Sequence, residues 1–147
     1  MGETMSVFDI DSSTLSEVGA WCALCHPASG QPLMSDGLPV RVRVAGPDGA
    51  RFRSARRQVR DALLERLAAA RERADTAALA ELEAEAEREM AAALTLDWEN
   101  VRLPTGEAFP CSPDNARRLF RDLPWLLAQV GGFAAERANF ITASGNG

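Results

Sequence analysis

Apolar and charged residues alternate over residues 40–44, where Val40, Val42 and Val44 are separated by two arginines. This period of two is typical of a β-strand with one buried and one solvated face. A short turn containing two glycines follows at 46–49, and the alternation resumes over 50–53. Two alternating runs joined by such a turn predict an antiparallel β-hairpin over residues 40–53.

Residues 54–96 have a different pattern, without glycine or proline and rich in alanine, leucine, glutamate and arginine. These residue types favour helices, and the apolar ones recur here at spacings of three and four. Asp75 or Thr76 can cap a new helix in the middle of the segment. One long bent helix remains an alternative, but it would be about 65 Å long, which suits a small domain poorly. We therefore expect two helices.

Two helix starts follow in the last third of the chain. Ser112 precedes Pro113, a pair that suits an N-cap and a first helical position, and Pro124 repeats the second signal. They predict helices over 113–121 and from 124 to about 140. Gly131 and Gly132 weaken the last helix by about 1 kcal/mol each relative to alanine, so a bend is expected there.

The patterns combine into an α+β fold with a small N-terminal antiparallel β-sheet, the hairpin, followed by about four α-helices. A length of 147 residues suits a single domain, expected over 15–141, β-rich over 15–53 and helical over 54–141. Residues 1–14 are expected to be a flexible N-terminus and 142–147 a disordered tail. The sequence has neither a secretory signal nor an apolar run of about 18 residues, so a cytoplasmic protein without membrane contact is expected.

Charge argues against nucleic acid as a partner. The formal net charge is −5, whereas binding to phosphate backbones needs clustered cations. On the predicted hairpin, Arg41, Arg43, Arg51 and Arg53 can form a basic patch, but the chain has no lysine and Phe52 is the only aromatic residue interleaved with these arginines. Five glutamates at alternate positions from 81 to 89 spread around a helix and indicate a solvated surface.

The string Cys22-x-x-Cys25-His26 is the sharpest chemical motif. It matches the attachment site of c-type haem, and with Cys111 it resembles part of a zinc site. Haem attachment of this kind follows export, and an alternating strand points the two paired thiols to opposite faces. We therefore interpret the cysteines as structural, and predict no cofactor, no metal and no catalytic residue. The lone His26 is interpreted as a solvated turn residue.

Aromatic residues concentrate in the last third of the chain. Most are expected in the core, because each large ring buries about 150–250 Å². One or two exposed rings can serve as anchors for a partner helix. The candidate partner-binding residues are Trp98, Phe109, Trp125 and Phe140.

Several short phrases of the sequence resemble the tail assembly chaperones of long-tailed bacteriophages. The resemblance extends over roughly residues 20–141 and includes the turn His26-Pro27-Ala28-Ser29-Gly30. The other phrases lie at 97–100, 106–116, 123–130 and 137–140. Cys111 departs from the small or apolar residue that such proteins carry before the Ser-Pro cap.

The resemblance implies a non-enzymatic protein of the infected host's cytoplasm that is absent from the mature virion. Such proteins bind the tape measure protein, keep it soluble and help to recruit tail tube subunits. Self-association, or association with a frameshifted longer form, is a further candidate interaction. Two alternatives stay open: a structural head–tail connector or tail completion protein, and a small metal- or haem-binding protein that uses the cysteines and His26.

Overall fold

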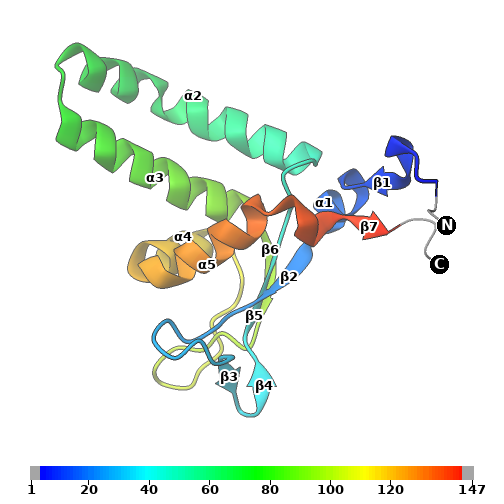
Figure 1. Ribbon diagram of the computed structural model, residues 1–147. Helices are drawn as coiled ribbons and strands as arrows, with labels where there is room; N and C mark the ends of the chain where they lie inside the picture. Colours follow the sequence, from blue (N-terminus) through cyan, green and yellow to red (C-terminus); the bar gives the residue numbers. More distant parts are fainter. Residues whose placement is uncertain (1–3, 144–147) are drawn as a thin grey trace.

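A computed structural model describes residues 4–143 as an α+β fold, which confirms the predicted class (Figure 1). A three-stranded antiparallel sheet has the order β2 (Ala20–Ala23), β5 (Arg41–Val44) and β6 (Thr95–Glu99). Val42 lies at the centre of this sheet, paired with Cys22 on one side and Trp98 on the other. The predicted small antiparallel sheet is therefore present, but strand β5 pairs with β2 and β6 and not with residues 50–53.

The prediction of a second hairpin strand is wrong, because residues 50–53 form the first turn of α2 (Ala50–Glu72). Four residues are too few to distinguish a period of two from a helical period, and Phe52 belongs to the helical series of Ala55 and Val59. The Glu17 carboxylate accepts a hydrogen bond from the backbone N–H of Ala50 and so caps the helix start. Strand β5 pairs instead with two strands that are remote in sequence.

Two separate helices form over the glycine-free segment, as predicted. Helix α3 (Thr76–Leu94) begins at Asp75, whose carboxylate accepts a hydrogen bond from the N–H of Ala78 at 3.0 Å. A second, smaller core lies between α2 and α3 and consists of the buried residues Leu63, Ala70 and Leu82. The two antiparallel helices extend beyond the sheet (Figure 1).

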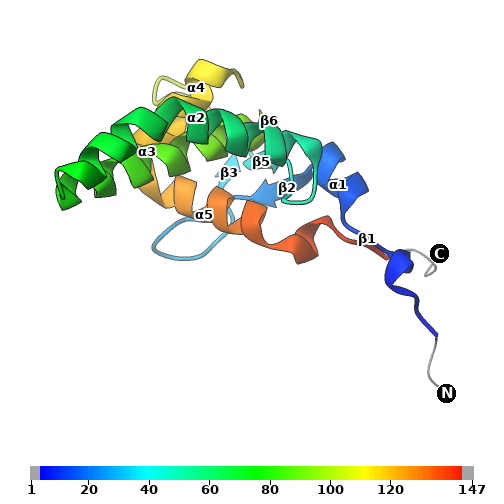
Figure 2. The same cartoon turned by 90° about the horizontal axis from the view of Figure 1, so that it is seen from above.

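The last two long helices pack against opposite sides of this helical hairpin (Figure 2). Helix α4 (Pro113–Asp122) starts at Ser112, which accepts a hydrogen bond from the N–H of Asn115 at 3.1 Å, as the sequence predicted. Helix α5 (Pro124–Ala135) ends five residues before the predicted end. It passes through both glycines and breaks at Glu136, where the backbone turns to an extended conformation before the 3₁₀ turn η2 (Arg137–Phe140).

The N-terminal segment that was expected to be flexible contains regular elements from residue 7 onward. These are the 3₁₀ turn η1 (Val7–Asp9), strand β1 (Ile10–Asp11) and helix α1 (Ser13–Val18). Strand β1 pairs with β7 (Thr142–Ala143), where the disordered tail was predicted to begin. The two predictions also include residues 1–3 and 144–147, which lie outside the described residues.

The main core lies where the sheet meets α3, α4 and α5. Its fully buried large side chains include Leu24, Val42, Val44, Phe120 and Phe140. A separate small ribbon, β3 (Met34–Ser35) with β4 (Leu38–Pro39), forms between β2 and β5. The sheet and its helices thus leave the far half of the α2–α3 hairpin free of the main core.

Candidate functional site

Three of the four predicted partner-binding aromatics are core residues. Trp98 and Phe109 stack with ring centroids 5.8 Å apart, and the Trp98 indole N–H donates a hydrogen bond to the Phe109 carbonyl oxygen at 2.6 Å. Phe140 is fully buried and makes an edge contact with Phe133. Of the four residues, Trp125 retains exposed surface, so a surface anchor among them is restricted to Trp125.

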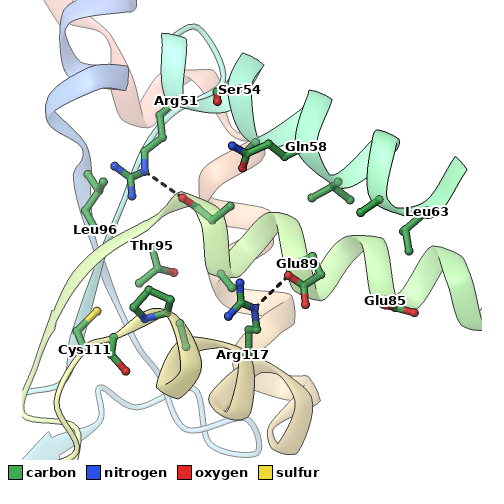
Figure 3. A pocket seen from close by; sticks show the side chains of 18 of the residues that line it. Arg51, Ser54, Gln58, Leu63, Glu85, Glu89, Thr95, Leu96, Cys111 and Arg117 are labelled. Atoms are coloured by element: carbon green, nitrogen blue, oxygen red, sulfur yellow. Dashed lines mark hydrogen bonds and ion pairs between the residues drawn. The ribbon is translucent and has the colours of Figure 1, made fainter.

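A long groove lies between α2, α3 and α4 (Figure 3). Its volume is about 1060 Å³, above the range of roughly 300–1,000 Å³ that is typical of small-molecule pockets. Along α2 it is lined from Ala50 to Arg66, a stretch of about 24 Å at 1.5 Å per residue. These dimensions suit a polypeptide segment, either extended or helical; a helix of this length has about four turns.

Small side chains line much of the groove, because they recur on one side of each helix. On α2 the four small residues lie at positions 50, 54, 55 and 62, which at 3.6 residues per turn fall within less than half of the helix circumference. Small side chains let the backbone of a bound segment approach closely, as they do between tightly packed helices. The alanines and serines of the lining are Ala50, Ser54, Ala55, Ala62, Ala92, Ala93, Ser112 and Ala116.

Four of the five charged side chains that line the groove form ion pairs. The Arg66 guanidinium lies 3.0 Å from a Glu85 carboxylate oxygen, which joins α2 to α3. Arg117 lies 3.2 Å from Glu89, which joins α4 to α3 (Figure 3). The Arg51 side chain donates to the Ala93 carbonyl oxygen at 3.0 Å. Because most of its charges are paired, the groove neither attracts nor repels a bound segment strongly by charge. It therefore suits a segment that has few charged residues on the side that faces the groove.

Two of the three cysteines have their thiols stabilised in the protonated form. Burial, with a smaller effect of Cys25, raises the pKa of Cys22 to about 11. Burial also raises the pKa of Cys111 at the groove, and the nearby Asp97 charge adds to it. A thiol with a raised pKa is a poor nucleophile and a poor metal ligand at neutral pH.

The turn after the cysteine pair is held by His26. Its Nδ1 accepts hydrogen bonds from the backbone N–H groups of Ala28 at 3.1 Å and Ser29 at 3.3 Å. Within residues 4–143, no three histidine, cysteine or acidic side chains come together in a way that could hold a metal ion. Across the same residues no helix has both the length and the apolarity to cross a bilayer.

Comparison with known proteins identifies the family. The model of the YdaY prophage protein family matches residues 47–145, about two thirds of the chain. The chain belongs to this family. Its phage origin is therefore shown, and this agrees with the phage origin that the sequence resemblance implied. No curated protein and no solved structure matches the chain.

All of the groove lies within the stretch that defines this family, since its lining residues fall between 50 and 117. Sequence reasoning identified the helices that form the groove but not the groove itself. Arg66, Glu85, Glu89 and Arg117 have the appearance of ordinary solvated charges in sequence. A usable signal was present in the small residues of α2, which recur on one side of a helix that is otherwise rich in arginine.

Proposed function

We propose that this YdaY family protein is a phage tail assembly chaperone. In this role it binds the tape measure protein, keeps that protein soluble, helps to recruit tail tube subunits and is absent from the mature virion. The observation that supports the proposal is the groove of about 1060 Å³ along α2, α3 and α4. Membership of a prophage protein family supports a role within the phage life cycle.

The groove favours a polypeptide client over a metabolite. It is longer than a small-molecule site, it is bordered by three helices, and four of its five charged side chains are engaged in ion pairs with one another. An amphipathic client helix can place small or apolar residues against the alanines and leave its polar side in water. Such a contact gives moderate affinity without large apolar anchors, which suits a chaperone that must release its client.

Blocking the groove tests this function. Ala62 is exposed and lines the groove, so Ala62→Trp fills the groove without disturbing a buried contact. Ala68 is an exposed alanine on α2 that is not part of the lining, which makes Ala68→Trp the matched control. Each variant is co-expressed with the tape measure protein encoded by the same prophage, and the soluble client is quantified.

We expect the unmodified chain and Ala68→Trp to keep the client soluble, and Ala62→Trp to leave most of the client insoluble, because the indole fills the groove. A client that is equally insoluble with and without this chain contradicts the chaperone role. A client that stays soluble with Ala62→Trp contradicts the groove as the binding site. Mass spectrometry of purified particles separates the proposal from a connector role, because a connector is retained in the virion.

A further inference from the structure

One charged side chain of the groove lining has no ion-pair partner, and it lies at one end of the groove. Four of the five charged residues of the lining form the two ion pairs described above. The fifth is Arg51, the second residue of α2. It lies where α3 passes into β6 at Thr95, and we call this end the sheet end of the groove (Figure 3).

A backbone contact holds Arg51 in place and uses only part of its guanidinium. Its Nε donates a hydrogen bond to the Ala93 carbonyl oxygen at 3.0 Å, which satisfies one of the carbonyl groups that the C-terminal end of α3 leaves free. Among residues 4–143, Arg51 forms no ion pair, and the Ala93 carbonyl is the only hydrogen-bond acceptor of its side chain. Its two terminal amino groups, Nη1 and Nη2, are therefore available to a ligand.

The surroundings of this guanidinium leave its charge without compensation. Figure 3 shows it between α2 and the start of β6, next to Leu96, which is half-buried. Cys111 lines the same end, and its raised thiol pKa keeps it uncharged at pH 7. Glu17 caps the start of α2 and Asp97 lies near Cys111, but neither forms an ion pair with Arg51. The sheet end thus has one positive charge that an outside partner can bind.

We propose that Arg51 binds a carboxylate of the client segment and thereby fixes which end of that segment lies at the sheet end of the groove. This inference rests on the proposed function, because it concerns the polypeptide that occupies the same groove. A guanidinium whose Nε is engaged still binds both oxygens of a carboxylate through Nη1 and Nη2. The carboxylate belongs either to an aspartate or glutamate side chain or to the C-terminus of the client.

The rest of the groove restricts the segment to this one charge. A nucleic acid or a strongly acidic peptide would bring further negative charges to Glu85 and Glu89, whose arginine partners are already engaged. The alanines and serines of the lining, which follow α2 over about 24 Å, instead favour small or apolar side chains. The client segment therefore has a carboxylate at one end and uncharged residues on its inner side over about four turns.

The same contact gives the groove a means of selecting segments. A bound segment that covers the sheet end removes water from Nη1 and Nη2 of Arg51. A carboxylate at this point replaces that water, whereas an uncharged side chain leaves the N–H groups without acceptors, which costs affinity. Discrimination then comes from the penalty on the wrong segment as well as from the bond to the right one.

Synthetic client peptides test this inference on the full chain. Peptides of about 20 residues, long enough to fill the groove, tile the tape measure protein encoded by the same prophage. Each is acetylated and amidated, except that the peptide from the client's C-terminus keeps its free carboxylate. Fluorescence anisotropy measures binding, and peptides whose binding is weakened by Ala62→Trp are groove ligands.

Each groove ligand should have a carboxylate in its first or last turn. Changing that residue from Glu to Gln or from Asp to Asn should weaken binding to the unmodified chain by about tenfold. For the C-terminal peptide, amidation should have the same effect, which distinguishes the two sources of the carboxylate. This measurement uses the unmodified chain and so does not depend on the folding of a variant.

Arg51→Gln should weaken binding of the carboxylate peptide by about tenfold and leave binding of its neutralised form unchanged. Arg57→Gln is the matched control, because Arg57 is exposed on α2 and lies outside the groove lining. It should bind both peptides like the unmodified chain. If Arg51 acted only as a cap of α3, Arg51→Gln would weaken both peptides equally, and that result overturns the inference.

The outcomes separate this inference from the proposed function. Groove ligands that bind equally well with and without their carboxylate, and equally well to Arg51→Gln, overturn the role of Arg51 and leave the groove as the client site. If no peptide binds the unmodified chain, or if Ala62→Trp weakens none, the groove is not the client site and both proposals fail.

Discussion

Gln129 of α5 forms a pair of hydrogen bonds with the backbone of Cys25, which lies 104 residues earlier in the chain. Its side-chain Nε2 donates to the Cys25 carbonyl oxygen at 2.8 Å, and its Oε1 accepts from the Cys25 N–H at 2.9 Å. The amide thereby replaces the missing strand partner of the chain just beyond β2. It joins helix α5 to the chain that continues β2, on the side of Cys25 that faces away from its bridge with Pro32.

Gln129→Ala should lower the free energy of unfolding by about 1–3 kcal/mol. The substitution leaves a half-buried donor and a half-buried acceptor without partners, which costs more than the net strength of the bonds. Urea unfolding followed by circular dichroism measures the change. Gln58→Ala, an exposed glutamine on α2, is the matched control and should stay within about 0.5 kcal/mol of the unmodified chain. Equal effects of the two substitutions would contradict the role given to Gln129.

Asp48 makes the stability of the fold depend on pH. Arg137 and the Ser12 hydroxyl bind its carboxylate and lower its pKa from 3.8 to about 2. Since the pKa is lower in the folded state, this stabilisation is fully present above about pH 4 and is lost as the pH falls through about 2. Asp48→Asn should therefore be less stable than the unmodified chain at pH 7. The difference in unfolding free energy should shrink between pH 4 and 2, whereas a difference that is constant with pH would rule out this linkage.

Gly46 is required by close packing rather than by its backbone angles. A Cβ atom there would lie 2.5 Å from the Phe140 ring and 2.6 Å from the Ser16 hydroxyl oxygen, and both residues are fully buried. Gly46→Ala should lower the free energy of unfolding by about 1–3 kcal/mol. At Gly132 of α5 a Cβ atom meets no atom within 4 Å, so Gly132→Ala should instead raise stability by about 0.5–1 kcal/mol. Thermal unfolding of both variants checks the opposite signs.

Trp98 and Trp125 should respond differently to truncation. Trp98 is 7% exposed, stacks on Phe109 and has its N–H hydrogen-bonded, so Trp98→Ala should cost about 3–5 kcal/mol of stability. Trp125 is half-buried, so Trp125→Ala should cost less than half as much. If Trp125 is a client anchor, its alanine variant also loses client affinity at a temperature where it stays folded. Unchanged client binding by folded Trp125→Ala would remove the last of the four predicted aromatic anchors.

The helical part of the fold was readable from the sequence because helices depend on neighbours three and four residues away. Ser112 caps the helix that the sequence assigned to it, and Asp75 is the one of the two candidate caps that is used; each accepts from a backbone N–H three residues later. The absence of glycine and proline over 54–96 and the three-and-four spacing of apolar residues predicted the α2–α3 hairpin for the same reason. Local chemistry also predicted the strand at 41–44 and the overall α+β class.

The pairing of strands and surfaces could not be read in this way, because it depends on contacts between distant residues. Arg41 pairs with Glu99, 58 residues away, and these two strands are brought together by the intervening helical hairpin. The groove likewise exists because α4 packs against α3 beside α2, although these helices are separate segments of the chain. A local pattern states which side of a helix is apolar or charged. Packing then determines which of those sides is covered, and that in turn determines where a partner can bind.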